Sequence, residues 1–311
     1  MIMAETVRNK PRTFRLSVRS DLEPNHGGEV RDEVYDPDRL AMSGASHILI
    51  LAHGFNNTAK EAQESYNKQL EALQEAGLDK RPVGPDAIAL FQWPGDLAIS
   101  PIRNAIIDSL GYSLDLRQAF KAADRLADFL ASLPKAGGEP AALKISFIGH
   151  SLGCRLILEA LNRLNRGAPS FDVVSLMAAA VPVELILAGK PLVPRIAVPR
   201  RLLKFFSEKD LVLQFAFPAG QQLASNQGIE RAAYREAVGR HGNPAGFGEP
   251  NPRHNNGHSD YWKDKVAAKV FVSTLDPTAP LPLIGREIGA HDLPAQNEMP
   301  GREMQSRNLP R

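Results

Sequence analysis

The sequence predicts an open α/β fold, in which helices cover both faces of a mostly parallel sheet. Five short apolar runs, each about as long as a buried strand, alternate with segments of helical periodicity. Strands that are buried on both faces read as continuous apolar runs, and parallel strands need long, usually helical connections. The two alternating patterns therefore predict a helix-covered parallel sheet. The five runs are Ile48–Ala52, Ile88–Trp93, Leu143–Ile148, Val173–Ala178 and Leu202–Ser207.

The length and composition fit one large domain with a tail at each end. The chain has 311 residues, of which 43% are hydrophobic, and open α/β folds routinely use about 250 residues for a single domain. We expect N-terminal edge strands or an arm at residues 1–40 and the main domain at residues 41–275. From residue 276 to 311 prolines and charges dominate without periodicity, which predicts a disordered tail.

Charge and hydropathy exclude several classes of partner. The net charge is +2, with 37 basic and 35 acidic residues and no basic run long enough to follow a phosphate backbone, so we expect no nucleic-acid partner. No segment approaches the roughly 20 apolar residues of a membrane span, and Met1–Arg19 lacks the apolar core of a signal peptide. The single cysteine, Cys154, excludes an internal disulfide framework. A cytoplasmic protein is expected.

The segment between the first two apolar runs carries clear helix signals. Thr58 and Glu61 match the T-x-x-E capping box, and an apolar stripe with helical spacing follows them. Gly77 stands where a left-handed C-terminal cap is expected.

Other elements follow from the same kinds of signal. A second helix is predicted over Ser113–Leu133, and a third begins at Leu152 and fades by Gly167. The third helix is apolar nearly all round, which predicts burial. Thr13–Val18 reads as an edge strand that could pair with Val30–Tyr35.

The motif GHSLG at Gly149–Gly153 directly follows the third apolar run and directly precedes the buried helix. This is the strand–turn–helix context of the nucleophile elbow in the α/β-hydrolase fold, whose strained turn raises a serine hydroxyl above the sheet. Ser151 is therefore the candidate nucleophile. The N–H of Leu152 lies at the helix N-terminus and is a candidate donor to an oxyanion. The alternative is a capping serine in a glycine-bracketed turn.

The segment HGFNN directly follows the first apolar run. In this fold the loop after that strand supplies the second backbone donor of the oxyanion hole. Gly54 lets the chain approach a substrate closely, and Phe55 N–H is the candidate donor. We expect Asn56 and Asn57 to shape the turn before the helix, and His53 to hold the loop in place.

The fold places its acid between the nucleophile and the histidine in chain order. Asp210 comes just after the Leu202–Ser207 run, from where its carboxylate can orient an imidazole. Glu208 is the local alternative, and Glu184 is the alternative if the acid comes one strand earlier.

Three histidines follow the candidate acid, and any of them could in principle be the base. His258 lies at the end of a loop rich in Gly, Pro and Asn, just before a new helical pattern, and this junction favours it. His254 is the alternative base, whereas His241 is expected to be a solvated loop residue.

Several of these motifs together resemble a known family. The segments HGFNNT (53–58), FQWP (91–94), GHSLG (149–153), KDLVL (209–213) and GHSDY (257–261) are similar to the bacterial α/β hydrolases catalogued as DUF900, a domain of unknown function. The resemblance covers roughly residues 48–272. It implies a serine hydrolase fold with Ser151, Asp210 and His258 as the triad, and it implies no substrate. The sequence shows no clear last strand before His258.

The surroundings of the site give weaker signals. Trp93 ends a predicted strand on the side where ligands bind, so it could form a wall of the substrate pocket, or it could simply be a core residue. The apolar, proline-containing segment Val181–Pro199 is too short for a cap domain, so no large cap is expected. Histidines and cysteine lack metal-ligand spacing, and we expect neither a metal nor a cofactor.

These observations predict a serine hydrolase that cleaves small-molecule carboxylic esters, or thioesters, through an acyl-enzyme. A lipase, or a peptidase or amidase on the same triad, is the alternative within this class. The alternative of another class is a catalytically silent α/β-hydrolase scaffold that only binds.

Overall fold

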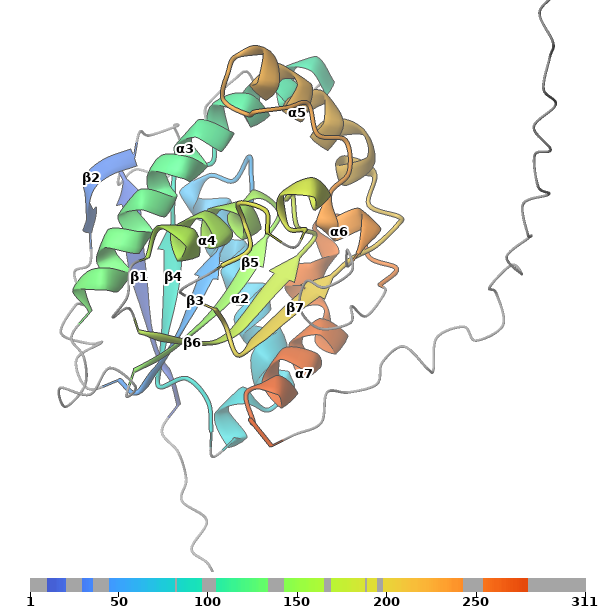
Figure 1. Cartoon of the computed structure of the whole chain (residues 1–311). Helices are drawn as coiled ribbons and strands as arrows, with labels where there is room; N and C mark the ends of the chain where they lie inside the picture. The colour runs from blue at the N-terminus through green and yellow to red at the C-terminus, as the bar shows by residue number, and fades with distance from the viewer. Residues whose placement is uncertain are drawn as a thin grey trace, which may run out of the picture.

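The computed structural model describes residues 10–20, 30–35, 45–81, 83–96, 105–133, 143–164, 169–187, 189–194, 198–242 and 254–278. Within these residues a seven-stranded sheet forms the centre of the molecule, and helices cover both of its faces (Figure 1). This confirms the predicted fold class. Of the expected C-terminal tail, residues 279–311 lie outside the described part of the chain.

The strand order in the sheet is β2-β1-β4-β3-β5-β6-β7, and every neighbouring pair is parallel except β1 with β2. The strands are β1 (Arg12–Arg19), β2 (Val30–Tyr35), β3 (His47–Ala52), β4 (Ala87–Gln92), β5 (Lys144–His150), β6 (Ser170–Met177) and β7 (Arg201–Phe205).

The five apolar runs correspond to β3 through β7, with ends that differ by at most three residues. Every side chain of β3 and β4 is buried, which explains why these strands show no alternation in the sequence. Among the described residues the sheet ends at β7, and residues 243–253, which precede the loop of His258, lie outside the described part of the chain.

The prediction that Thr13–Val18 forms an edge strand is wrong, although its pairing with Val30–Tyr35 is confirmed. β1 lies between β2 and β4 and is parallel to β4, so β2 is the edge strand. Only the first half of β1 alternates between buried and exposed side chains, whereas its second half is buried throughout. The alternating start is what resembles an edge strand.

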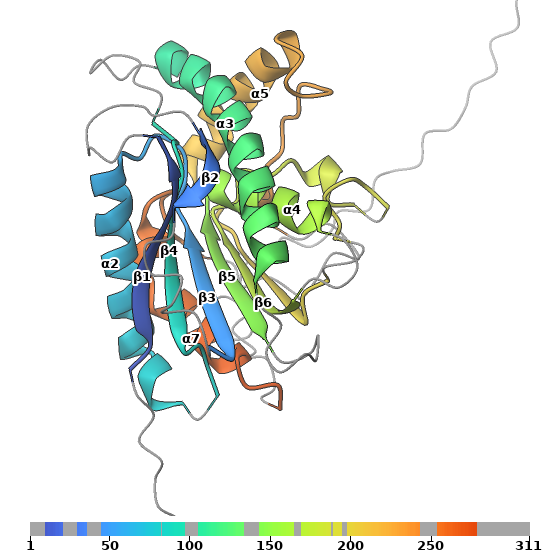
Figure 2. The same cartoon turned by 90° about the vertical axis from the view of Figure 1, so that its left-hand side faces the viewer.

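The helices lie in two layers. On one face α3 (Ala105–Ser132) and α4 (Leu152–Arg163) pack on the sheet, and on the other face lie α2 (Ala59–Glu75) and α7 (Lys265–Thr274) (Figure 2). Shorter elements complete the chain: η1 (Leu78–Lys80), η3 (Val183–Leu185), the π-helix η4 (Val212–Ala216), α5 (Phe217–Asn226), α6 (Val238–His241) and η5 (Asp260–Lys263).

The local helix signals are confirmed where the structure tests them. The Thr58 hydroxyl accepts the Glu61 N–H, the Glu61 carboxylate accepts the Thr58 N–H, and Gly77 is left-handed with φ of 86°. The second helix is longer than predicted, because α3 begins at residue 105. No helix in the described part of the chain is both long and apolar enough to cross a membrane.

A buried ion pair ties β1 to the segment that follows β4. The Arg19 guanidinium donates to both carboxylate oxygens of Asp96, at 2.7 and 3.1 Å, and also to the carbonyl of Trp93 at 3.3 Å. Both charged side chains are almost completely buried. Removing one partner of such a pair leaves an uncompensated charge away from water.

Asp96→Ala should therefore lower the free energy of unfolding by about 3–5 kcal/mol, measured by urea denaturation. The matched control is Glu75→Ala, which removes the acid of an exposed pair with Lys265 and should cost less than about 1 kcal/mol. Equal effects of the two substitutions would contradict the structural role of the buried pair.

Candidate active site

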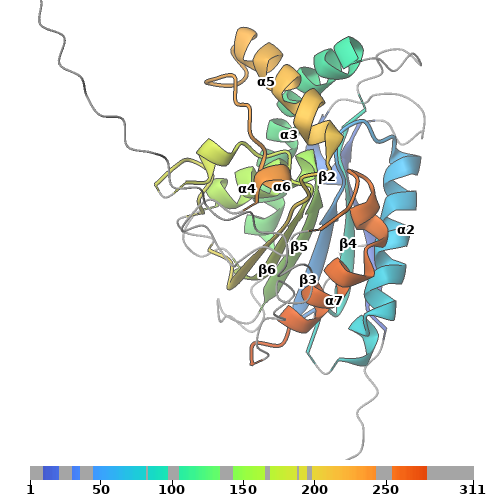
Figure 3. The same ribbon diagram turned by 90° about the vertical axis from the view of Figure 1, so that its right-hand side faces the viewer.

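The candidate site residues gather at the carboxyl ends of the central strands, where open α/β sheets bind their ligands. The HGFNN loop follows β3, the GHSLG motif begins with the last two residues of β5, and Asp210 comes five residues after β7. Residues 254–260, which come between α6 and α7 in the chain, lie at the same edge of the sheet (Figure 3).

The turn at Ser151 is tight and strained. Ser151 has φ of 52° and ψ of −121°, a conformation that costs a non-glycine residue about 1–3 kcal/mol. Three backbone hydrogen bonds hold it: Ser151 N–H donates to Met177 O at 3.0 Å, and Ser151 O accepts the N–H groups of Ala180 and Cys154, both at 3.1 Å. The Ser151 side chain therefore has a fixed direction.

The glycines on both sides of Ser151 are required by close contacts. A Cβ on Gly153 would lie 2.3 Å from the carbonyl oxygen of His53, and one on Gly149 would lie 2.7 Å from the Ile157 side chain. A side chain at position 153 would therefore require the backbone at the end of β3 to move, and one at position 149 would require the Ile157 side chain to shift beside a Cys154 backbone only 3.1 Å away.

The structure brings Ser151, His258 and Asp210 into one hydrogen-bonded chain. His258 Nε2 lies 3.0 Å from Ser151 Oγ, and His258 Nδ1 lies 2.8 Å from Asp210 Oδ2. Because a carboxylate oxygen accepts, Nδ1 carries the proton of the neutral ring and Nε2 is left free to accept from the serine hydroxyl.

Asp210 is fully buried and is itself held in place. Its second oxygen, Oδ1, accepts the N–H of Leu213 at 2.9 Å, and its backbone N–H donates to Ser207 O at 3.1 Å. Both carboxylate oxygens therefore have partners, and the carboxylate is aimed at the imidazole of His258.

The alternative residues of the sequence analysis lie elsewhere. The side chains of Glu184 and Glu208 are exposed, and so is that of His241 on α6. His254 is buried, but its Nδ1 pairs with Asp264 at 2.7 Å.

A second histidine, His150, fixes the backbone of His258. His150 Nε2–H donates to the carbonyl of His258 at 2.7 Å, and its ring packs 5.0 Å from the His258 ring and 5.1 Å from the Trp262 ring. Burial lowers the pKa of His150 to about 3, so it stays neutral. The sequence gives no direct indication of this role; the position of His150 beside Ser151 in the GHSLG motif is the only signal.

The loop that carries His258 is anchored at Asp264. One carboxylate oxygen accepts from His254 Nδ1 and Asn256 Nδ2, while the other caps α7 by accepting the N–H groups of Val266 and Ala267. Burial alone would raise the pKa of Asp264, but these hydrogen bonds outweigh it and hold the pKa at about 2.

The HGFNN loop (residues 53–57), which we call the oxyanion loop after its predicted role, lies directly against Ser151, the candidate nucleophile. A Cβ on Gly54 would be 2.8 Å from Ser151 Cβ, so only glycine allows this approach. Leu152 is the first residue of α4, and its N–H has no partner within the helix. Asn57 Nδ2 donates to the carbonyls of Phe55 (2.8 Å) and Gly54 (3.2 Å), which fits the expected turn-shaping role.

The buried imidazole ring of His53 anchors the same loop through hydrogen bonds. Its Nδ1–H donates to Gly54 O at 2.9 Å, and Nε2 accepts the N–H of Trp93 at 3.3 Å. The Tyr66 hydroxyl accepts the His53 N–H and donates to the carbonyl of Phe91. Burial lowers the pKa of His53 to about 3 and keeps it neutral.

Trp93 was predicted as a possible wall of the pocket, and the structure places it elsewhere. Its side chain is fully buried, stacks on His53 with ring centroids 5.3 Å apart, and donates Nε1–H to His53 O at 2.9 Å. Trp93 thus supports the oxyanion loop from the core, as its alternative interpretation proposed.

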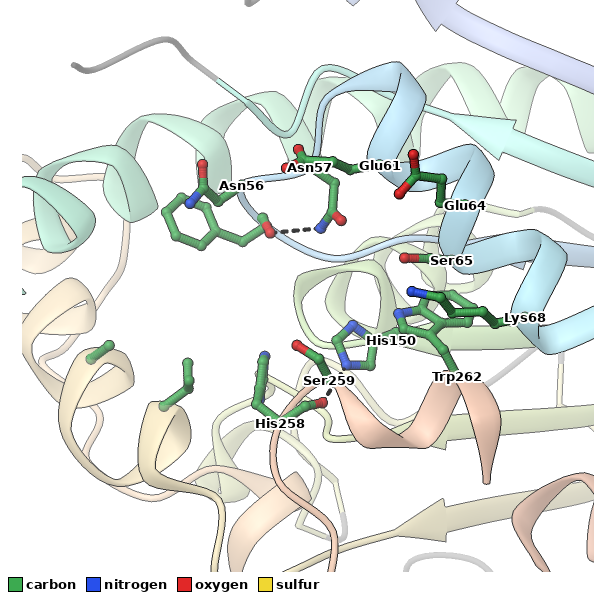
Figure 4. A pocket seen from close by; sticks show the side chains of 13 residues that line it. Asn56, Asn57, Glu61, Glu64, Ser65, Lys68, His150, His258, Ser259 and Trp262 are labelled. Carbon is green, nitrogen blue, oxygen red and sulfur yellow. Dashed lines mark hydrogen bonds between the residues drawn. The ribbon is translucent and has the colours of Figure 1, made fainter. Parts of the chain in front are cut away.

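A pocket of about 430 Å³ opens in front of His258 and the oxyanion loop. Figure 4 shows His150, His258 and Ser259 on one side of it, with Asn56 and Asn57 on the other. Phe55 and Trp262 also line this space. The described residues contain no group of three or more His, Cys, Asp or Glu side chains that could hold a metal ion.

The low pKa of Asp264 predicts a pH-dependent contribution to stability. Its carboxylate stabilises the fold above its ordinary pKa of 3.8, and this contribution is lost as the pH falls towards about 2. The difference in unfolding free energy between the parent and Asp264→Asn should therefore shrink between pH 5 and pH 3, measured by urea denaturation. A constant difference over that range would show that the charge of Asp264 does not stabilise the fold.

The comparisons with known proteins place the chain in a family. The alpha/beta hydrolase family matches residues 49–304. The search of curated proteins found no match. The resemblance to DUF900 itself stays a prediction.

Similar solved structures include a gene product of Listeria innocua (10% identity, 74% of this chain and 94% of that chain, TM-score 0.39). They also include acyl-protein thioesterase 2 of Zea mays (16%, 74% and 94%, TM-score 0.35) and carboxyl esterase 2 of Tuber melanosporum (10%, 75% and 79%, TM-score 0.30). Since the family match covers most of the chain, the protein belongs to the alpha/beta hydrolase family.

Proposed function

We propose that this hydrolase is a serine esterase, which cleaves carboxylic esters or thioesters through an acyl-enzyme. The observation that carries the proposal is the hydrogen-bonded chain from Asp210 through His258 to Ser151, with 2.8 and 3.0 Å between the heavy atoms. This geometry is what an activated serine needs: a base within hydrogen-bond reach, and a third group that orients the base.

In the acylation step His258 Nε2 takes the proton of Ser151 as Oγ attacks the carbonyl carbon of the ester. The negative charge moves to the carbonyl oxygen, where the N–H groups of Phe55 and Leu152 stabilise it by about 3 kcal/mol per donor. The intermediate then collapses. The bond to the alcohol oxygen breaks, and the imidazolium of His258 gives its proton to the leaving alcohol.

Deacylation repeats the same steps with water. His258 removes a proton from a water molecule, and the resulting hydroxide attacks the acyl carbon. When the bond to Ser151 Oγ breaks, the imidazolium returns its proton to the serine, and a carboxylic acid leaves. The consumption of one water per ester balances the reaction and needs no cofactor.

Two further groups keep the base in position during this cycle. Asp210 fixes the ring tautomer and stabilises the imidazolium, and its burial keeps water from competing for the hydrogen bond. His150 holds the His258 backbone through a hydrogen bond that does not change during proton transfer, because the pKa of about 3 keeps His150 neutral.

Ser151→Ala should abolish labelling by a fluorophosphonate probe and lower kcat/KM for p-nitrophenyl acetate by a factor on the order of 10⁴ or more, since the nucleophile is gone. Labelling is read by mass spectrometry of the intact protein. Ser225→Ala, a substitution on α5 away from the site, is the control and should label like the parent. A folded parent that neither labels nor turns over esters would favour the silent binding scaffold instead.

Asp210→Asn should lower kcat by roughly 10⁴-fold with little change in folding, because the amide keeps the volume but favours the wrong tautomer of His258. Glu208→Gln is the matched control, since Glu208 is an exposed acid two residues away. The measurement is steady-state hydrolysis, with circular dichroism to verify the fold. If Glu208→Gln caused the larger loss, the acid would have been assigned wrongly.

A further inference from the structure

Three exposed apolar side chains lie together just after Asp210. Leu211 is 63% exposed, Val212 42% and Phe215 65%, and we call these three residues the apolar rim. Only a few large apolar side chains are this exposed in the described part of the chain, and nearly half of them stand in this one short segment. Contiguous exposed apolar surface is typical of interaction sites and ligand-binding grooves, whereas scattered single residues need no explanation.

The segment that carries the apolar rim is firmly fixed. Val212–Ala216 is a π-helix, a rare geometry that is frequent at functional sites. Between the rim residues Leu213 is buried, and its N–H donates to Asp210 Oδ1 at 2.9 Å. The exposure of the rim is thus a consequence of a defined backbone, which turns Leu213 inward and its neighbours outward.

The apolar rim continues into the pocket in front of the candidate triad. Val212 and Ala216 line that pocket together with Phe55 and His258. A ligand atom next to His258 is therefore within the same cavity as the side chain of Val212, and a chain that leaves the cavity on this side reaches the exposed rim.

The opposite wall of the pocket is polar. It is formed by α2, which contributes the polar side chains Glu64, Ser65 and Lys68. Figure 4 shows these three side chains on the α2 helix, across the pocket from the ribbon of η4 and α5, with His150 and His258 between the two walls. The pocket thus has one polar and one apolar side, and the candidate base lies between them.

We propose that the substrate is an amphipathic ester, whose apolar chain lies along the apolar rim while its polar portion faces α2. This inference rests on the proposed esterase function and adds the class of ester. Covering apolar surface favours binding in proportion to the area removed from water. An ester bond held at Ser151 has its two halves on opposite sides, so one half meets each wall.

The occupant that fits the apolar rim is a substrate chain. The rim consists of three side chains, whereas a stable protein–protein interface buries roughly 20–30 residues a side. The continuity of the rim with the pocket of His258 also ties it to the reacting ester. A chain of several methylenes matches both its small size and its position.

The test is chain-length selectivity in two substrate series. One series is p-nitrophenyl esters with acyl chains of two to six carbons, and the other is acetate esters of alcohols of two to six carbons. In one of the two series kcat/KM should rise by roughly twofold per methylene, about half of the fourfold that complete burial of a methylene gives. The series that shows the rise identifies the half of the ester that the rim binds.

The rim variant Val212→Thr/Phe215→Ser should lose most of this dependence on chain length while the shortest ester is still hydrolysed. The control is Val198→Thr/Val266→Thr, which removes apolar surface at two exposed positions (61% and 47% exposed) that do not line the pocket. The control should keep the slope of the parent. A flat response of the parent in both series, or an unchanged slope in the rim variant, would overturn the proposal.

A binding measurement separates this proposal from the esterase function. In Ser151→Ala, calorimetry of the intact esters should show tighter binding of the six-carbon than of the two-carbon member, by about 16-fold over four methylenes at twofold each. If the parent hydrolyses no ester while this ratio is found, the esterase proposal fails and the rim stands as a binding surface. If esters are hydrolysed without any such ratio, the rim proposal fails alone.

Discussion

The close contact between the first turn of α4 and the end of β3 is the constraint on which the site depends. Gly153 stands against the carbonyl oxygen of His53, and Gly54 stands against Ser151, in both cases with no room for a side chain. These contacts bring the strained turn of Ser151 and the oxyanion loop side by side. A strained backbone of this kind persists only where its surroundings determine it from several directions, and here a strand, a helix and a loop do so together.

Three histidines of the site have different properties because their surroundings differ. His53 and His150 are buried and hydrogen-bonded to backbone carbonyls, which keeps them neutral and makes them fixed donors. His258 keeps a side chain that is 15% exposed and faces a carboxylate on one side and a hydroxyl on the other. Only His258 combines access to the pocket with two partners that fit proton transfer.

Charged, polar and apolar side chains lie on different sides of the site. In the core beside the oxyanion loop, the charges of Arg19 and Asp96 compensate each other. In front of the site the two walls of the pocket differ, with polar side chains on α2 and apolar ones on η4. The buried pair thus helps to hold the oxyanion loop in place, and the two walls offer different surfaces to the two halves of the proposed ester substrate.

The sequence by itself determined the strands β3–β7, the capping box at Thr58 and the elbow at Ser151, because each of these rests on a signal that spans a few neighbouring residues. It also indicated the candidate acid and base through their chain order. Only the tertiary structure decided that β1 lies inside the sheet, that Trp93 is buried behind the oxyanion loop and that His150 holds His258. These features depend on packing between segments that are far apart in the chain. A local sequence pattern does not show which distant segments come together.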